Sequence, residues 1–294
     1  MGPVLLAIMA SLFWGVGTAL QKYGMSSEFP KITLANCFWQ IIPILKTLLV
    51  NWHWMLGLVC MFGGMICFAT ALGLGDMALV QPLIGLTGVV AAFIGVTVLK
   101  EKIKGIEIAG IAGIVFGVAL VGAAGGERTF QMPSDANLMF FTALTILLAT
   151  GAFLLKKFQI STEFTLAFTA GIILGLANLM GKLLAERAII ETGLPFVLWS
   201  VPILVSIFSD YPVYIVTVTN ILGGILLQTA YSNGRAGVIS PITTIMSFVM
   251  PLLASLTIFG EKIRTTQALG IVVILVGTAL LATKEEQKKQ ALED

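Results

Sequence analysis

Residues 75–122 read GDMALVQPLIGLTGVVAAFIGVTVLKEKIKGIEIAGIAGIVFGVALVG, and residues 234–281 read GRAGVISPITTIMSFVMPLLASLTIFGEKIRTTQALGIVVILVGTALL. Each copy has a proline early in a long apolar run, Pro82 and Pro241, and each closes that run with Glu-Lys-Ile. Matching glycines then mark a second apolar run. The copies are separated by roughly half of the chain. Such duplication is typical of membrane proteins in which one half moves against the other around a central site.

The composition places the chain in a membrane. Of 294 residues, 57% are hydrophobic and only 11% are charged, whereas soluble domains carry about 25% charged residues. A helix needs roughly 20 apolar residues to cross the hydrocarbon layer. The sequence predicts ten such spans, which leave no room for a soluble catalytic domain: 3–22, 32–50, 54–74, 77–99, 105–124, 137–155, 164–185, 212–232, 236–259 and 266–283.

The predicted fold is an all-α polytopic membrane protein of ten transmembrane helices, built as two inverted five-helix repeats. Five spans per half is an odd number, so the second half would enter the membrane from the opposite side. Counted on these spans, Lys and Arg favour a cytoplasmic N-terminus, by ten to seven. The predicted organisation is a first repeat at 1–124, a linker at 125–136, a second repeat at 137–283 and a charged tail at 284–294. Segment 193–210, with two prolines, is interpreted as an interfacial or re-entrant insertion, or alternatively as an eleventh span.

Polar side chains inside the spans are the candidate solute-binding residues, because they are costly in lipid and usually face the bundle interior. Their spacing of three or four residues puts them on single helix faces. The alternative is that they only join helices by hydrogen bonds. The predicted substrate-binding set is Trp14, Thr18, Gln21, Asn36, Gln40, Gln81, Asn178, Asn220, Gln228, Tyr231 and Ser240.

The two matching prolines are the candidate gating positions. Proline removes a helical hydrogen bond, and paired breaks at matching positions of two repeats point to a binding region or its gates. Asp76 and Arg235 occupy matching junctions between spans and could act as gate residues, or simply as loop charges. Lys182, near a span end, is expected to extend its ammonium group to the interface.

The spans 105–124 and 266–283 consist almost entirely of glycine, alanine and branched aliphatics, with a GxxxG face at Gly113 and Gly117. We interpret them as a scaffold or as the contact of a homodimer. The single histidine, His53, has no acidic or thiol cluster around it in the sequence. The sequence therefore indicates no enzyme, no metal site, no cofactor and no nucleic-acid partner, and energy would come from a gradient.

Ser11 to Gly15 (SLFWG) resembles the start of EamA-type domains, and the paired runs with their Glu-Lys-Ile hinges resemble the end of that domain. Two such domains in tandem are similar to a ten-span member of the drug/metabolite transporter superfamily. The strings at 11–24, 79–83 and 239–242 also resemble the NIPA magnesium-transporter branch. The resemblance implies inverted repeats, a central cavity and alternating access.

The functional expectation is a secondary-active transporter of small polar, amino-acid-like metabolites in the plasma membrane, with a proton or another ion as coupling ion. Amides, hydroxyls and an indole suit a neutral or zwitterionic solute. The first alternative is a NIPA-type transporter of divalent cations. Mg²⁺ favours oxygen ligands that include carboxylates, and no carboxylate is expected at mid-depth. The second alternative is a non-transporting scaffold or an integral enzyme.

Overall fold

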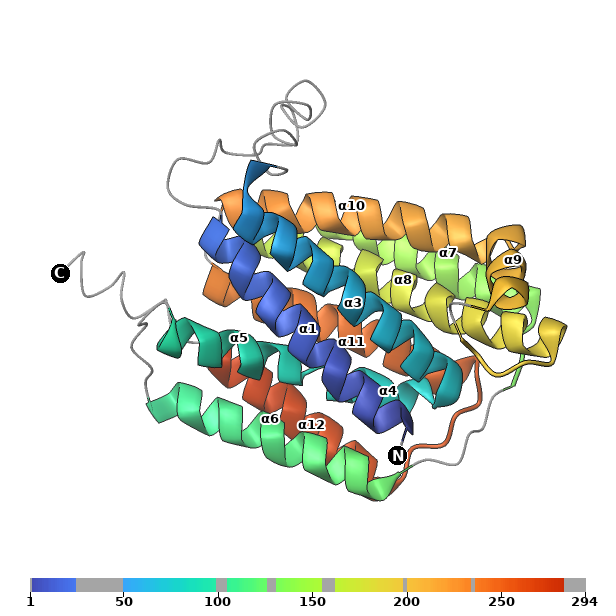
Figure 1. The fold of residues 1–294 in the computed structure, drawn as a ribbon, viewed down its shortest axis with the longest axis horizontal. Helices are drawn as coiled ribbons and strands as arrows, with labels where there is room; N and C mark the ends of the chain where they lie inside the picture. The colour runs from blue at the N-terminus through green and yellow to red at the C-terminus, as the bar shows by residue number, and fades with distance from the viewer. Residues whose placement is uncertain are drawn as a thin grey trace.

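The computed structural model describes residues 2–24, 50–98, 105–125, 131–154, 162–197, 200–233 and 236–282, and in these ranges every regular element is a helix (Figure 1). The helices are α1 (Gly2–Gly24), α3 (Trp52–Leu74), α4 (Met77–Leu83), α5 (Leu86–Thr97), α6 (Gly105–Ala124), α7 (Asp135–Leu154), α8 (Thr162–Thr192), α9 (Val201–Ser209), α10 (Pro212–Asn233), α11 (Ala236–Thr257) and α12 (Thr265–Ala282).

The helices have the length and composition of membrane spans. In the described part of the chain, six spans are long and apolar enough to cross a bilayer, with α4 and α5 counted as one. A seventh is formed if α9 and α10, which are bent by 77° relative to each other, count as one span. Large apolar side chains such as Phe93, Phe116 and Leu147 remain exposed on the outside, as expected where lipid replaces water. The protein is therefore an integral, multi-pass membrane protein.

The first two described helices, α1 and α3, run in opposite directions. A Cβ on Gly17 would lie 2.9 Å from the carbonyl oxygen of Gly57, and one on Gly75 would lie 2.8 Å from Cβ of Pro3. These contacts make α1 and α3 antiparallel neighbours (Figure 1). The predicted span 32–50 lies outside the described residues. The five crossings expected in the first half therefore stay a prediction.

The two copies of the repeated stretch run in opposite directions. In α6 and α12, a Cβ on Gly117 would lie 2.6 Å from the Gly270 carbonyl oxygen, and one on Gly277 would lie 2.7 Å from that of Gly110. Only glycine permits this approach of two antiparallel backbones. The glycine faces of α6 and α12 thus pack against each other within one chain. This packing fits the scaffold interpretation, and the homodimer contact stays a prediction.

The matching prolines do not have matching effects. Beside Pro82 the helix is interrupted, since α4 ends at Leu83 and α5 begins at Leu86. The hydroxyl of Ser11 lies 3.0 Å from the carbonyl oxygen of Leu83 at this break. By contrast, α11 continues through Pro241 without interruption. A helix break therefore accompanies only the first of the two prolines, and the gating roles of Pro82 and Pro241 stay a prediction.

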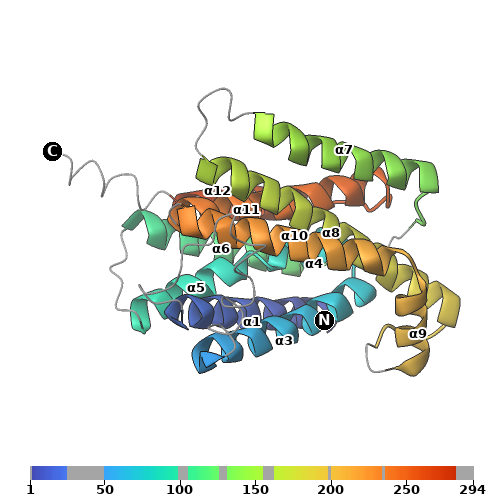
Figure 2. The same cartoon turned by 90° about the horizontal axis from the view of Figure 1, so that it is seen from above.

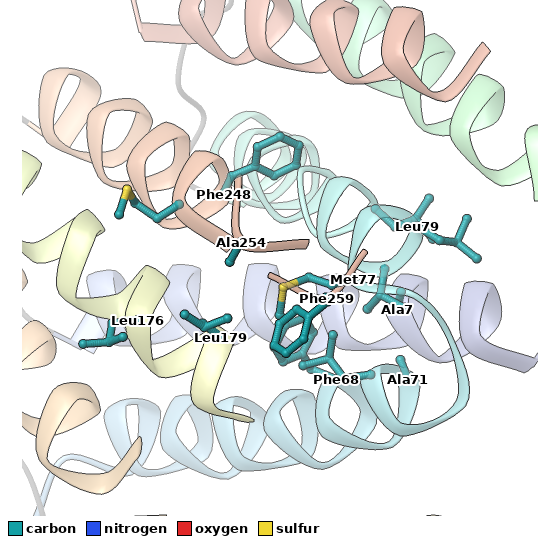
Figure 3. Close-up of a cluster of buried hydrophobic side chains, with 14 of the residues drawn as sticks. Ala7, Phe68, Ala71, Met77, Leu79, Leu176, Leu179, Phe248, Ala254 and Phe259 are labelled. Carbon is teal, nitrogen blue, oxygen red and sulfur yellow. The ribbon is translucent and has the colours of Figure 1, made fainter. Parts of the chain in front are cut away.

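One end of the bundle, here called the N-terminal end, contains the start of α1, the junction between α3 and α4, and the loop 258–264. Figure 3 shows Phe259 beside Met77, with Phe68 and Ala71 around them. Phe259 and Met77 are completely buried, so the loop is anchored in the core at this end. Figure 2 shows α7 at one edge of the bundle and the α1–α3 pair at the opposite edge, with α8 between them.

Candidate functional site

Helix α8 is the central element of the site. Its span is 67% buried, the largest share among the candidate spans of the described residues. Gly171 and Gly175 face α11, and a Cβ on Gly171 would lie 2.7 Å from the carbonyl oxygen of Thr243. Asn178 and Lys182 continue the same face, at spacings of three and four residues. The close approach of the two backbones brings these two polar side chains against α11, α3 and α4.

Three residues form what we call the amide node: Gln81 of α4, Asn178 of α8 and Ser247 of α11. The side-chain nitrogens of Gln81 and Asn178 lie 3.2 and 3.5 Å from the Ser247 carbonyl oxygen. That carbonyl would normally accept the N–H four residues later, but position 251 is proline and has none. Pro251 therefore frees the oxygen that the two amides share.

The amide node keeps one oxygen without a donor. Gln81 is 3% exposed, and its side-chain oxygen Oε1 has no hydrogen-bond partner among the described residues. A buried acceptor left in this state costs about 1–3 kcal/mol. Gln81 and Asn178 were both predicted as substrate-binding residues, and the structure brings them together. The node can accept a hydrogen bond or coordinate a cation through this oxygen, and each of its two amide nitrogens already has one contact, with the Ser247 carbonyl oxygen.

A second polar group, the buried charge cluster, consists of Asp76, Lys182, Glu186 and Glu261. The Lys182 ammonium group donates to the carbonyl oxygens of Leu72 at 2.8 Å and Gly75 at 2.7 Å, and pairs with Glu186 at 2.7 Å. A cation at the C-terminus of α3 offsets the helix dipole. Lys182 is completely buried, so the expectation that it extends to the membrane interface is wrong.

Glu261 completes the opposite helix end. Its two carboxylate oxygens accept the backbone N–H groups of Met77 at 3.0 Å and Ala78 at 2.8 Å. The carboxylate thereby caps the N-terminus of α4, where negative charge is favoured. Asp76, at the N-cap position itself, makes no capping hydrogen bond with its side chain and is 5% exposed. The predicted gate residue is thus buried within a cluster, whereas Arg235 lies outside the described residues.

The environment of Glu261 acts on its proton affinity in two directions. Burial is the largest effect, and it raises the pKa of this carboxyl group. The hydrogen bond from Ala78, the charge of Lys182 and the hydrogen bond from Met77 lower the pKa. The negative charge of Asp76 raises it further. The net result is a raised pKa. The neutral form of Glu261 is therefore easier to reach than that of an exposed glutamate.

The loop 258–264 is also tied to the linker that precedes α7. The backbone N–H of Gln131 donates to the Phe259 carbonyl oxygen at 3.0 Å. Arg264 donates to the carbonyl oxygen of Ala124, and Gln267 to that of Gly125, each at 2.8 Å. These bonds join three separate chain segments. The N-terminal end of the bundle is therefore closed by a bonded loop rather than by loose contacts.

Comparison with known proteins places this arrangement in context. The first 123 residues match the EamA-like transporter family. The resemblance predicted from the sequence is thereby confirmed for this part of the chain. A protein of Arabidopsis thaliana named "Probable magnesium transporter NIPA9" is 24% identical over 300 residues, covering 95% of this chain and 81% of the relative. Another, "Probable magnesium transporter NIPA6" of the same plant, is 23% identical over 316 residues, covering 98% and 89%. No solved structure matches the chain significantly.

The candidate residues of α1, within the EamA-like region, lie at a helix contact. The Trp14 indole N–H donates to the Met61 carbonyl oxygen at 3.1 Å, and its ring packs 5.2 Å from Phe68. Thr18 donates to the Trp14 carbonyl oxygen, and the Gln21 side chain lies against Gly57. Trp14 and Gln21 thus join α1 to α3, whereas the exposed Thr18 bonds only within α1. The structure does not bring them to the amide node.

The remaining candidates are dispersed or not described. Asn220 is exposed and donates to the Val216 carbonyl oxygen of its own helix at 2.9 Å. Asn36 and Gln40 lie outside the described residues, as do the side chains of Gln228, Tyr231, Ser240 and Pro241. Pro251, Glu186 and Glu261 were not among the site residues predicted from the sequence. The sequence signal for the amide node was the proline four residues after Ser247, because it leaves the Ser247 carbonyl oxygen without its helical N–H partner.

A cavity in the described part of the chain has a different character from the two polar groups. It measures about 630 Å³ and lies between α7, α8 and α10. The hydroxyls of Thr145, Thr150 and Thr219 on its walls donate to carbonyl oxygens of their own helices, so they expose methyl groups to the cavity. No group of three or more His, Cys, Asp or Glu side chains suited to a metal ion occurs among the described residues. This cavity is apolar and separate from both polar groups.

Proposed function

We propose that this protein is a membrane transporter that moves a small cation by alternating access, with Mg²⁺ as the first solute to test. The observation that carries the proposal is the amide node, where the two oppositely directed copies of the repeat meet. There, Gln81 Oε1 is buried without a donor and the Ser247 carbonyl is freed by Pro251. Oxygen atoms of amides and backbone carbonyls are ligands that hard cations accept.

The buried charge cluster supports a positively charged solute. A solute that moves from the amide node towards the N-terminal end, along α8, would approach Asp76, Glu186 and Glu261, with Lys182 as the cation of the group. More negative than positive charge in a protein interior lowers the energy of a passing cation. The relatives named as probable magnesium transporters point to the same solute. These carboxylates also weaken the argument, made from the sequence, that Mg²⁺ would find none along the path.

Alternating access needs two ends that open in turn. The N-terminal end is closed by the loop 258–264, through Glu261 and Phe259. Opening it requires α11 and α12 to move relative to the α3–α4 junction. The break between α4 and α5, and the turn of α11 where Pro251 removes the helical partner of the Ser247 carbonyl, are the points where the two helices can bend at lowest cost.

A neutral, amino-acid-like metabolite is the second candidate. Side-chain amides form the node, and none of the described carboxylates touches Gln81 or Asn178 by a hydrogen bond. An ammonium or hydroxyl group of such a solute could donate to Gln81 Oε1. The second candidate differs from the first in its solute, and it uses the same site.

The orientation in the membrane is part of the proposal. Counted on the ten predicted spans, Lys and Arg favour a cytoplasmic N-terminus. Protease access to a tag at the N-terminus of intact cells tests this, because a cytoplasmic tag would be protected.

A flux assay in proteoliposomes tests the function. Purified protein is reconstituted, a proton gradient is imposed, and uptake of Mg²⁺ is compared with counterflow of a mixed amino-acid pool. Saturable Mg²⁺ flux supports the first candidate, and amino-acid counterflow without Mg²⁺ flux supports the second. Neither flux above protein-free vesicles, with protein that remains folded, would refute transport of both solute classes. Location in the plasma membrane and the identity of a coupling ion remain predictions.

A further inference from the structure

We infer that the Glu261 carboxylate is a proton-binding site whose occupancy is coupled to closure of the N-terminal end of the bundle. Glu261 is 3% exposed, lies in the loop between α11 and α12, and holds the first two N–H groups of α4. The same loop inserts Phe259 into the core. Any movement that opens this end must withdraw both side chains and bring water to the carboxylate.

Hydration on opening changes the affinity of Glu261 for a proton. In the closed form, burial raises its pKa above that of an ordinary glutamate. In an open form, water would return the pKa towards its usual value. By linkage, the form with the higher pKa is favoured by protons, so low pH favours closure and rising pH favours opening. A proton from the adjacent aqueous side binds on closing and returns there on opening.

The neighbouring charges fit this role. Among the described residues, the titratable groups that act on Glu261 are Asp76 from the α3–α4 junction and Lys182 from α8. Glu186 lies one turn further along α8 and pairs with Lys182 at 2.7 Å. The two other cationic residues of the loop, Lys262 and Arg264, are exposed. Because Asp76 repels and Lys182 attracts the Glu261 charge, each sets the pH range of the transition.

Hydrogen exchange measured by mass spectrometry tests the coupling in the whole protein, in lipid nanodiscs and without solute. The readout is the protection of amides in the 76–82 peptide, which includes the two N–H groups that Glu261 accepts. After correction for intrinsic exchange rates, protection should fall as pH rises from 5 to 9, by at most about tenfold per pH unit for one proton. Protection that is independent of pH would overturn the inference.

Three variants distinguish Glu261 from other acids. Glu261→Gln, which imitates the protonated form, should make protection independent of pH. Glu107→Gln removes another buried carboxylate, in α6, and should keep the wild-type response. If Glu261→Gln does not fold, Asp76→Asn decides, because loss of the repulsion should move the transition to lower pH. A Glu261→Gln variant with the wild-type response, a Glu107→Gln variant without it, or an unshifted Asp76→Asn variant would each overturn the inference.

This inference rests on the proposed transport function only for its consequence, a proton-linked solute cycle. Exchange is measured without flux. A protein with proton-linked closure and no flux would refute the transporter proposal and leave this inference standing. Mg²⁺ or metabolite flux with exchange that is independent of pH would do the reverse.

Discussion

Replacing Lys182 with methionine should destabilise the protein strongly. Lys182 is completely buried, and its ammonium group serves two carbonyl oxygens and Glu186 at 2.7–2.8 Å. Removing one partner of a buried ion pair typically costs about 3–5 kcal/mol, because the other charge stays in a medium of low polarity. In Lys182→Met, Glu186 loses its cation and the C-terminus of α3 loses a bound donor.

The double variant Lys182→Met with Glu186→Leu separates the charge effect from the packing effect. Replacing both members of a buried pair by apolar residues is often neutral or stabilising. The remaining loss is that of the hydrogen bonds to Leu72 and Gly75, about 1 kcal/mol each. The double variant should therefore be more stable than the single variant, by roughly 1–3 kcal/mol.

Thermal unfolding in detergent measures these differences. At about 2 °C per kcal/mol for a large domain, Lys182→Met should lower the apparent Tm by roughly 6–10 °C, at a fixed scan rate. Lys262→Met, which removes an exposed lysine of the neighbouring loop, is the matched control and should change the Tm little. A loss below about 2 °C for Lys182→Met, or a double variant no more stable than the single one, would refute the reasoning.

Three further changes test separate parts of the account. Gly117→Ala should lower the Tm, because its Cβ would lie 2.6 Å from the Gly270 carbonyl oxygen and overpacking costs about 1–3 kcal/mol. Gly113→Ala, whose Cβ would lie 3.6 Å from Gly277, is the control and should not lower the Tm. Equal effects of the two substitutions would contradict the α6–α12 packing. Pro251→Ala supplies the helical N–H that Ser247 lacks, so it should raise stability and lower flux in the vesicle assay; unchanged flux would count against the freed carbonyl. Asp76→Asn should reduce Mg²⁺ flux and spare amino-acid counterflow, and unimpaired Mg²⁺ flux would remove Asp76 from the cation path.

The sequence allowed the helical membrane fold to be predicted because apolar runs of about 20 residues have few alternatives in lipid. The number of crossings stays a prediction, because segment 32–50 lies outside the described residues. Composition alone also does not reveal that α1 and α3 are antiparallel neighbours. The glycines of α6 and α12 were recognised from their spacing, but the partner of each face was not.

Site residues could be predicted where the spacing along one helix places polar side chains on a single face. They could not be predicted where the role depends on a partner from a distant part of the chain. Gln81 and Asn178 were predicted from helix faces, and they meet at Ser247. Lys182 was misjudged because its partners, Leu72 and Gly75, lie more than one hundred residues earlier in the chain. Glu261 was noted only as part of a repeated motif, and its role as the cap of α4 depends on contact between the two halves.

The most direct test of the central claim is Mg²⁺ flux through the Gln81→Ala variant, measured in the same vesicle preparation as the wild type and Asn220→Ala. Hydrogen bonds or ligand contacts to a charged group are worth about 1.5–3 kcal/mol. The account therefore predicts at least about a tenfold loss of flux for Gln81→Ala. It predicts none for Asn220→Ala, whose exposed amide bonds only to its own helix. Wild-type flux in a folded Gln81→Ala protein would contradict the account.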